Sequence, residues 1–104
     1  MSQVVEFPLK QADATVPLTF DFTSELPSGV TVSAATTTCT VWSGTDASPQ
    51  SVVDGAASIS GTVVTQVVTG GVNGVIYLLE CKATGSDGNI YPLQGYLAVT
   101  TALP

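Results

Sequence analysis

The sequence offers few of the side chains with which proteins carry out chemistry. Its 104 residues include no His and no Arg, two Cys, and only two basic residues, Lys10 and Lys82, against eight acidic ones. A nucleophilic Ser or Cys needs a base beside it, most often His, so the usual partner for such catalysis is missing. The net charge of −6 also argues against nucleic acid or a membrane surface as a partner, because both are bound through Lys and Arg. We therefore predict a protein that is not an enzyme and uses no cofactor.

The carboxylates are the remaining candidates for catalysis or for a metal site. Paired carboxylates can cleave glycosides, and Ca²⁺ requires about six to eight oxygen ligands. Most of the acidic residues fall in or beside turn-like stretches, where Asp accepts hydrogen bonds from its own backbone. We interpret them as solvated turn carboxylates and predict no catalytic and no metal site. The eight residues are Glu6, Asp13, Asp21, Glu25, Asp46, Asp54, Glu80 and Asp87.

Two cysteines, Cys39 and Cys81, stand far apart in the sequence. Without His they do not complete the roughly four-ligand shell of zinc. The N-terminus lacks the features of a signal peptide, so we expect synthesis in the cytosol, where disulfides are rare. Two buried thiols are therefore the favoured interpretation. A disulfide, stabilising by about 4 kcal/mol in a loop-entropy model, is the alternative, and it would suit an immunity- or adhesion-type domain.

The elements that would position these residues are strands. From Val16 to Thr23, the apolar residues Leu18, Phe20 and Phe22 alternate with polar ones, which is the pattern of a strand with one buried face. Ten Gly and six Pro are spread along the chain and predict frequent turns. The pattern predicts an all-β, immunoglobulin-like β-sandwich of about seven strands in residues 16–104, with a small closed barrel as the competing fold. The main strands are expected at residues 16–23, 30–42, 62–69, 75–84 and 90–101.

The strand expected at residues 30–42 carries the only tryptophan. The parity of its apolar residues changes across residues 33–36, which predicts a β-bulge or a kink. Beyond that point Trp42 shares its parity with Thr38 and Thr40. We interpret Trp42 as a core aromatic whose truncation would cost about 3–5 kcal/mol. The alternative is an exposed Trp42 in a ligand groove.

Residues 1–15 form an N-terminal segment that is either an extended arm or an edge strand. Val4, Val5, Phe7 and Leu9 are apolar, and from Val5 onward they alternate with other residues to give one apolar face. Pro8 restricts the segment to a sheet edge or to an extended conformation outside a sheet. An arm would dock on a neighbouring chain, whereas an edge strand would complete the sandwich of its own chain.

Four stretches together resemble the phage fibre–tail adaptors, a family of small tailed-phage proteins. They are DFTSELPSGVTVS (residues 21–33), VWSGTDASP (41–49), TQVVTGGVNG (65–74) and LQGYLAV (93–99), and the resemblance covers about residues 18–100. It implies a virion protein of immunoglobulin-like fold, made in the cytoplasm of the bacterial host. Such a protein would join tail fibres to the tail or neck, in several copies around the tail that form a homo-oligomeric ring.

This resemblance directs attention to surfaces that meet other virion proteins. The chain has 10% charged residues, well below the usual value of about 25%, which suits a surface covered by neighbours. Val4, Val5, Phe7 and Leu9 would form an arm packed on a neighbouring chain. The turn with Gly70, Gly71 and Asn73 and the loop at residues 43–50 are further interface candidates, because loops on a rigid scaffold often carry contacts.

A carbohydrate-binding or host-surface module is the alternative function. It would use aromatic side chains as stacking platforms. The candidates are Trp42, Tyr77, Tyr91 and Tyr96.

Overall fold

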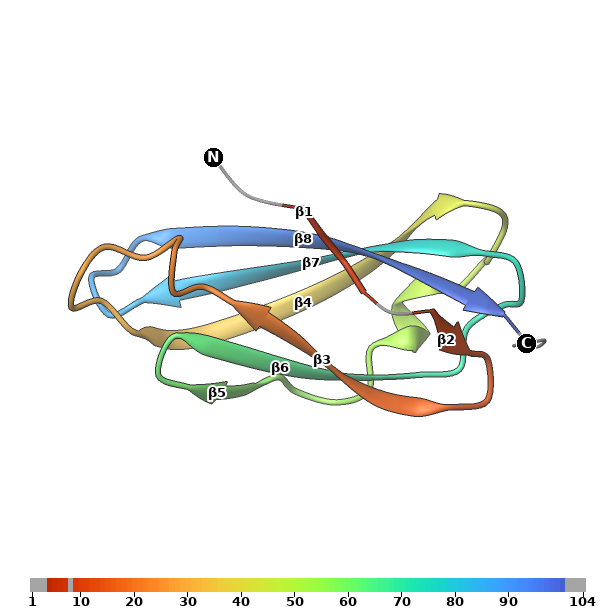
Figure 1. Ribbon diagram of the computed structural model, residues 1–104, viewed down its shortest axis with the longest axis horizontal. Helices are drawn as coiled ribbons and strands as arrows, with labels where there is room; N and C mark the ends of the chain where they lie inside the picture. Colours follow the sequence, from red (N-terminus) through yellow and green to blue (C-terminus); the bar gives the residue numbers. More distant parts are fainter. Residues whose placement is uncertain (1–3, 8, 101–104) are drawn as a thin grey trace.

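The computed structural model describes residues 4–7 and 9–100, which form two facing layers of β-strands (Figure 1). One sheet has the order β1-β8-β7-β4, with β2 also pairing with β8, and the other has the order β3-β6-β5. The predicted all-β, sandwich-like fold is confirmed, and the immunoglobulin-like type stays a prediction. The elements are β1 (Val4–Glu6), β2 (Lys10–Gln11), β3 (Thr15–Asp21), β4 (Val32–Ser43), a 3₁₀ turn η1 (Pro49–Val52), β5 (Ser58–Ser60), β6 (Val63–Thr69), β7 (Ile76–Gly85) and β8 (Ile90–Thr100).

The core lies between the two sheets and follows the alternation of the sequence. On β3, Leu18 and Phe20 point inward and are buried, whereas Thr19 and Asp21 are exposed. On β7, Tyr77 and Leu79 face them from the opposite sheet and are also completely buried. Because strand side chains alternate between the two faces, each strand contributes every second residue to this core.

Both cysteines belong to this core. Cys39 and Cys81 are free and buried, which confirms the interpretation as buried thiols and not the disulfide alternative. Burial raises the pKa of the Cys39 thiol to about 12, with a further contribution from the negative charge of Asp46. Burial also raises the pKa of Cys81 to about 11. Neither thiol is therefore a nucleophile at neutral pH, because the thiolate is the reactive form.

The predicted irregularity in the strand after residue 30 is confirmed. The pairing of β4 with β7 shifts in register between Val32 and Ala34, so Ser33 is an extra residue on β4. A second shift follows between Val41 and Ser43, where Trp42 is the extra residue. Bulges of this kind bend a strand and re-aim a side chain.

Each outer edge of the sheets is covered or interrupted. The edge of β8 is covered by β1 and β2, which pair with it in parallel. β3 carries Pro17, which has no N–H to donate, and β5 is only three residues long. Along β4, the side-chain amide of Gln50 takes the place of a neighbouring strand as a hydrogen-bond partner of the backbone. Its Oε1 accepts from the Cys39 N–H at 2.9 Å, and its Nε2 donates to the Thr37 carbonyl at 3.2 Å.

Candidate interaction surfaces

Three connecting segments meet at one end of the sandwich, on the right in Figure 1. They are the segment at residues 9–14, the loop at residues 43–48 and the turn at residues 70–74, and we call this region the loop end. It brings together two surfaces that the sequence singled out separately, the Gly-rich turn and much of the 43–50 loop. The N-terminal segment joins them through β2.

Tyr77 connects two of these segments from within the core. Its ring is completely buried, and its hydroxyl donates to Asp46 Oδ2 at 2.6 Å and accepts from the Val72 N–H at 2.8 Å. Burial, together with the bond to Asp46, raises the pKa of Tyr77 to about 12. The same bond lowers the pKa of Asp46, as does the bond that Asp46 accepts from the Ser48 N–H. Both segments are thereby fixed to the core.

Lys10 connects the third segment. Its side chain is almost entirely buried, with 3% exposed, and its Nζ donates to the carbonyls of Gly70 at 2.7 Å and Gln11 at 2.8 Å. Burial lowers the pKa of this ammonium group, and Asp13 partly opposes the shift. Lysine is rarely buried unless its charge is paired or its donors are satisfied, and here backbone carbonyls satisfy them. The sequence does not indicate this role, because a Lys beside a polar stretch is usually exposed to solvent.

Gly71 is required in the Gly-rich turn by both conformation and space. Its φ is +100°, and a Cβ added there would lie 3.0 Å from Cγ2 of Val99. Beside it the turn presents Val72, which is 43% exposed, and β2 is preceded by Leu9, which is 50% exposed. Asn73 is exposed as well. The loop end thus presents apolar side chains on a backbone with fixed geometry.

A groove opens beside Leu9. It lies between the N-terminal segment and β3, has a volume of about 340 Å³, and is lined mainly by apolar side chains. Its lining residues are Leu9, Lys10, Gln11, Ala14, Val16, Pro17 and Leu18.

Phe7 fixes the N-terminal segment to its own sandwich in this structure. Its N–H donates to the Tyr96 carbonyl at 3.0 Å, and its ring packs edge-on against Phe20 with the centroids 5.3 Å apart. A Cβ at Gly95 would collide with this ring, so Gly95 is the residue that admits Phe7. Val4 and Val5 pair with β8 through their backbones. Pro8, to which we gave a structural role, lies outside the described residues.

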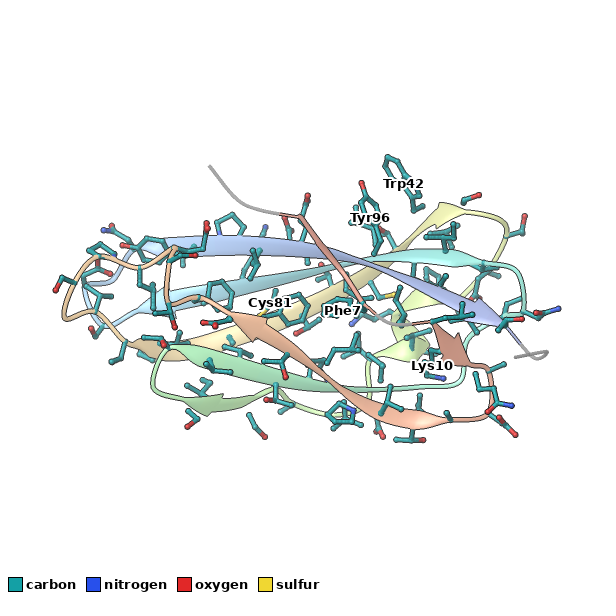
Figure 2. All side chains as sticks on the ribbon, in the orientation of Figure 1. Phe7, Lys10, Trp42, Cys81 and Tyr96 are labelled. Atoms are coloured by element: carbon teal, nitrogen blue, oxygen red, sulfur yellow. The ribbon has the colours of Figure 1, made fainter. Side chains whose placement is uncertain are left out.

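A second surface covers the outer side of the β8-β7-β4 sheet. Trp42 is 60% exposed there, so its interpretation as a core aromatic was wrong, and of the alternative the exposure is confirmed. The bulge at Trp42 and its shared parity with the exposed Thr38 and Thr40 explain this placement. Figure 2 shows Trp42 and Tyr96 standing on the outer side of the sheet, whereas Phe7 and Cys81 lie between the sheets.

We call this surface the aromatic face and define it as Trp42, Ile76, Leu78, Tyr96 and Ala98. The rings of Trp42 and Tyr96 are 5.0 Å apart and tilted by 55°. A shallow hollow of about 270 Å³ is lined by these residues, except Leu78, together with Phe7. Tyr77 does not contribute, because it is buried, and this removes it from the predicted stacking platforms.

Three of the acidic side chains accept hydrogen bonds from the backbone of their own turn, which is the local role expected of Asp beside turns. Asp21, Asp46 and Asp87 each accept a hydrogen bond from the backbone N–H two residues later. These bonds, with side-chain bonds from Thr23, Tyr77 and Tyr91, lower the pKa of the three carboxyls. In residues 4–7 and 9–100, no group of three or more potential ligands stands together to hold a metal ion. Over the same residues, no helix has the length and hydropathy needed to cross a membrane.

A family model described as podophage GP4 fiber-tail adaptor protein gp77 matches residues 10–94. The chain belongs to this adaptor family. The resemblance drawn from the sequence is thereby confirmed, and the chain is a structural protein of a podophage particle. The matched range includes the 43–48 and 70–74 segments of the loop end, whereas β1 and the end of β8 lie outside it. No curated protein matches the chain.

Proposed function

We propose that the chain joins tail fibres to the tail or neck of the phage particle through protein–protein contacts, in several copies arranged as a ring. The loop end is the surface that meets the other virion proteins. The N-terminal segment, with Val4, Val5, Phe7 and Leu9, contributes a contact to a neighbouring chain. The finer assignment to the immunoglobulin-like type is part of this proposal and is supported by the two facing sheets.

The observation that carries the proposal is the rigid, apolar construction of the loop end. Lys10 and Tyr77 fix the three segments to the core, so these segments lose little conformational entropy when a partner binds. Leu9 and Val72 are nevertheless left exposed, and the groove beside Leu9 has room for a partner side chain. Exposed apolar groups on preorganised loops are what a binding surface requires.

The test is binding of the purified chain to the tail, neck and fibre proteins of the phage that encodes it. A double variant, Leu9→Asp with Val72→Asp, places two charges on the loop end, and we expect it to lose this binding. The matched control is Ile59→Asp with Ile90→Asp, which changes two exposed apolar residues at the opposite end of the sandwich. Equal binding by the two variants would contradict the assignment to the loop end.

The N-terminal contact is tested separately. A chain that lacks residues 1–6 keeps Phe7 and Lys10, so its circular dichroism spectrum should be that of a folded β-protein. We expect weaker assembly into the ring from this chain. Unchanged assembly would contradict a contact of Val4 and Val5 with a neighbouring chain.

A carbohydrate-binding module is the second candidate function, because Trp42 and Tyr96 lie together on an exposed face. The hollow offers few polar groups, whereas sugar sites combine stacking with several hydrogen-bonding groups. Glycan binding that is lost in Trp42→Ala would favour this candidate over the adaptor proposal.

A further inference from the structure

Three glycines of the chain follow an Asp or an Asn, and each of these pairs lies exposed between two elements. The pairs are Asp54-Gly55, Asn73-Gly74 and Asp87-Gly88. At such a pair the backbone nitrogen of the glycine can attack the side-chain carbonyl carbon of the residue before it, because glycine has no Cβ to obstruct the approach. The φ of the three glycines is similar, at +75°, +83° and +86°, so other contacts decide where this reaction occurs.

At Asn73-Gly74 the attacking nitrogen is already hydrogen-bonded. The Gly74 N–H donates to the Val99 carbonyl at 2.9 Å. The nitrogen becomes a nucleophile only when it loses this proton, and a bond to a carbonyl oxygen keeps the proton in place. This turn is also tied to β8 by a second bond, from the Val99 N–H to the Val75 carbonyl at 3.0 Å. We therefore expect the folded chain to protect this pair.

At the third pair both reacting groups are held. The Gly88 N–H donates to the Gly85 carbonyl at 2.9 Å. The Asp87 carboxylate accepts from the Tyr91 hydroxyl at 2.8 Å and from the Asn89 N–H at 3.1 Å. These bonds lower the pKa of Asp87, so less of its neutral carboxyl group is present, and water leaves from the neutral form. We expect this pair to be protected as well.

The pair Asp54-Gly55 leaves both reacting groups without a partner. Within residues 4–7 and 9–100, neither the Asp54 carboxylate nor the Gly55 N–H makes a hydrogen bond or an ion pair. The backbone beside them is held, since the Asp54 N–H donates to the Val67 carbonyl at 2.9 Å. Gln66 Nε2 donates to the Gly55 carbonyl at 3.1 Å and to the Asp54 carbonyl at 3.4 Å. Because the Asp54 carbonyl and the Gly55 N–H share one peptide group, a donor at this carbonyl makes the N–H more acidic.

We propose that Asp54-Gly55 is a site of spontaneous covalent modification, at which Asp54 converts to isoaspartate in the folded chain. The Gly55 nitrogen forms a bond to Asp54 Cγ, and its proton leaves with the hydroxyl of the neutral carboxyl group as water, which gives a five-membered succinimide. Water then adds to the backbone carbonyl carbon of Asp54, and the bond from that carbon to the Gly55 nitrogen breaks. The main chain now runs through Cγ and is longer by one methylene group, and the mass is unchanged. This goes beyond the proposed function, because the reaction needs no partner protein.

The longer main chain disturbs the contacts that hold this connection. Gln66 is buried, with 1% exposed, and its amide depends on the carbonyls of Asp54 and Gly55 as acceptors. Moving them leaves buried N–H groups without acceptors, which is unfavourable. The neighbouring Val53 forms a β-bridge with Val68 of β6, so the shift reaches the sheet. We expect the modified chain to have a lower urea midpoint than the fresh chain.

The experiment follows all three pairs in one sample. The purified chain is incubated near neutral pH in water enriched in heavy oxygen, beside a sample unfolded in guanidinium chloride. Each opening of a succinimide places one heavy oxygen atom in the chain. Peptic peptides are then fragmented by electron transfer, which locates the label and distinguishes isoaspartate from aspartate.

The measured quantity is the rate in the folded chain divided by the rate in the unfolded chain. We expect a ratio near one at Asp54. At Asn73 and Asp87 the ratio should be smaller by about fivefold or more, which corresponds to breaking one hydrogen bond.

Two variants provide matched comparisons within one chain. Asn73→Asp creates a second Asp-Gly pair whose glycine N–H is bonded. In the folded variant we expect Asp54 to react faster than position 73, whereas the unfolded variant should show similar rates. Asp54→Glu keeps the charge but requires a six-membered ring that closes far more slowly, so labelling at this position should stop. Circular dichroism verifies that both variants are folded.

Three results would overturn the proposal. They are equal ratios at the three pairs, absence of label at Asp54 in the folded chain while the unfolded chain is labelled, and faster reaction at position 73 than at Asp54 in folded Asn73→Asp. None of these results affects the loop-end test, which compares binding of Leu9 and Val72 variants to virion proteins.

Discussion

Tyr77 combines two roles that are usually separate. Its ring fills the core, and its hydroxyl holds Asp46 and the Val72 N–H at the loop end. Replacing the hydroxyl with hydrogen, as in Tyr77→Phe, would leave the Val72 N–H without this acceptor. Orphaned groups of this kind cost about 1–3 kcal/mol. The core and the loop end are thus coupled through a single oxygen atom.

The hydrogen-bonded pair of Asp46 and Tyr77 predicts how the free energy of unfolding depends on pH. Because the pKa of Asp46 is lower in the folded chain, its contribution is present above its ordinary value of about 3.9 and is lost as the pH falls through the folded pKa. The pKa of Tyr77 is raised to about 12 in the folded chain. The contribution of Tyr77 to stability is therefore complete below its ordinary pKa of about 10 and is lost as the pH rises through the folded pKa. Urea unfolding across this pH range should show both losses.

Two variants test which residue causes the loss of stability at acid pH and which causes the loss at alkaline pH. Asp46→Asn should make the acid slope shallower without abolishing it, since the pKa values of Asp21 and Asp87 are lowered too. Tyr77→Phe should remove part of the alkaline slope. An unchanged pH profile in both variants would contradict the coupling.

The sequence patterns predicted the positions of the strands well, but they predicted the burial of single side chains less well. Trp42 was assigned to the core from its hydrophobicity, although its parity with two exposed threonines was the better signal. The burial of Lys10 has no signal in the sequence, because its acceptor, the Gly70 carbonyl, is sixty residues away in the chain. Such contacts depend on how the sheets face each other, and no local pattern records that.

The strands followed the sequence closely, because alternation fixes which face of a strand is buried. The predicted strand at residues 75–84 corresponds to β7, and that at residues 16–23 to β3. The N-terminal segment was harder, since an arm and an edge strand have the same apolar pattern. A Gly within a strand can mark a bulge or a close approach of another group, and at Gly95 the described structure shows the close approach of Phe7.

That approach predicts how β1 is held on β8. Gly95→Ala would push the Phe7 ring from its place against Phe20, and overpacking of this kind typically costs about 1–3 kcal/mol. We expect a lower urea midpoint and faster amide exchange at Phe7. Leucine lacks the outer part of the ring, so the double variant Gly95→Ala with Phe7→Leu should recover part of the loss. No recovery would mean that the ring is not the cause.

For the whole molecule, charge imbalance predicts a response to salt. The chain carries eight acidic residues and two basic ones. Raising NaCl from about 0.01 M to about 0.1 M shortens the Debye length from about 30 Å to about 10 Å, which weakens repulsion within the folded chain. We expect the urea midpoint of the chain to rise over this range.

The control removes charge rather than screening it. Adding Glu25→Gln and Asp54→Asn takes away two of the eight negative charges and changes the net charge from −6 to −4. The salt response should become smaller by a corresponding amount. A response of the same size in this variant would indicate an effect of salt on hydration rather than on repulsion.

The Gln50 side chain has a consequence for how this chain can meet other chains at its sheet edge. Bare strand edges invite other chains to add on and grow into fibrils. Gln50 occupies the middle of the longest such edge with an amide that satisfies one donor and one acceptor, so an incoming strand would first have to displace it. The β4 edge is thereby protected from open-ended strand addition.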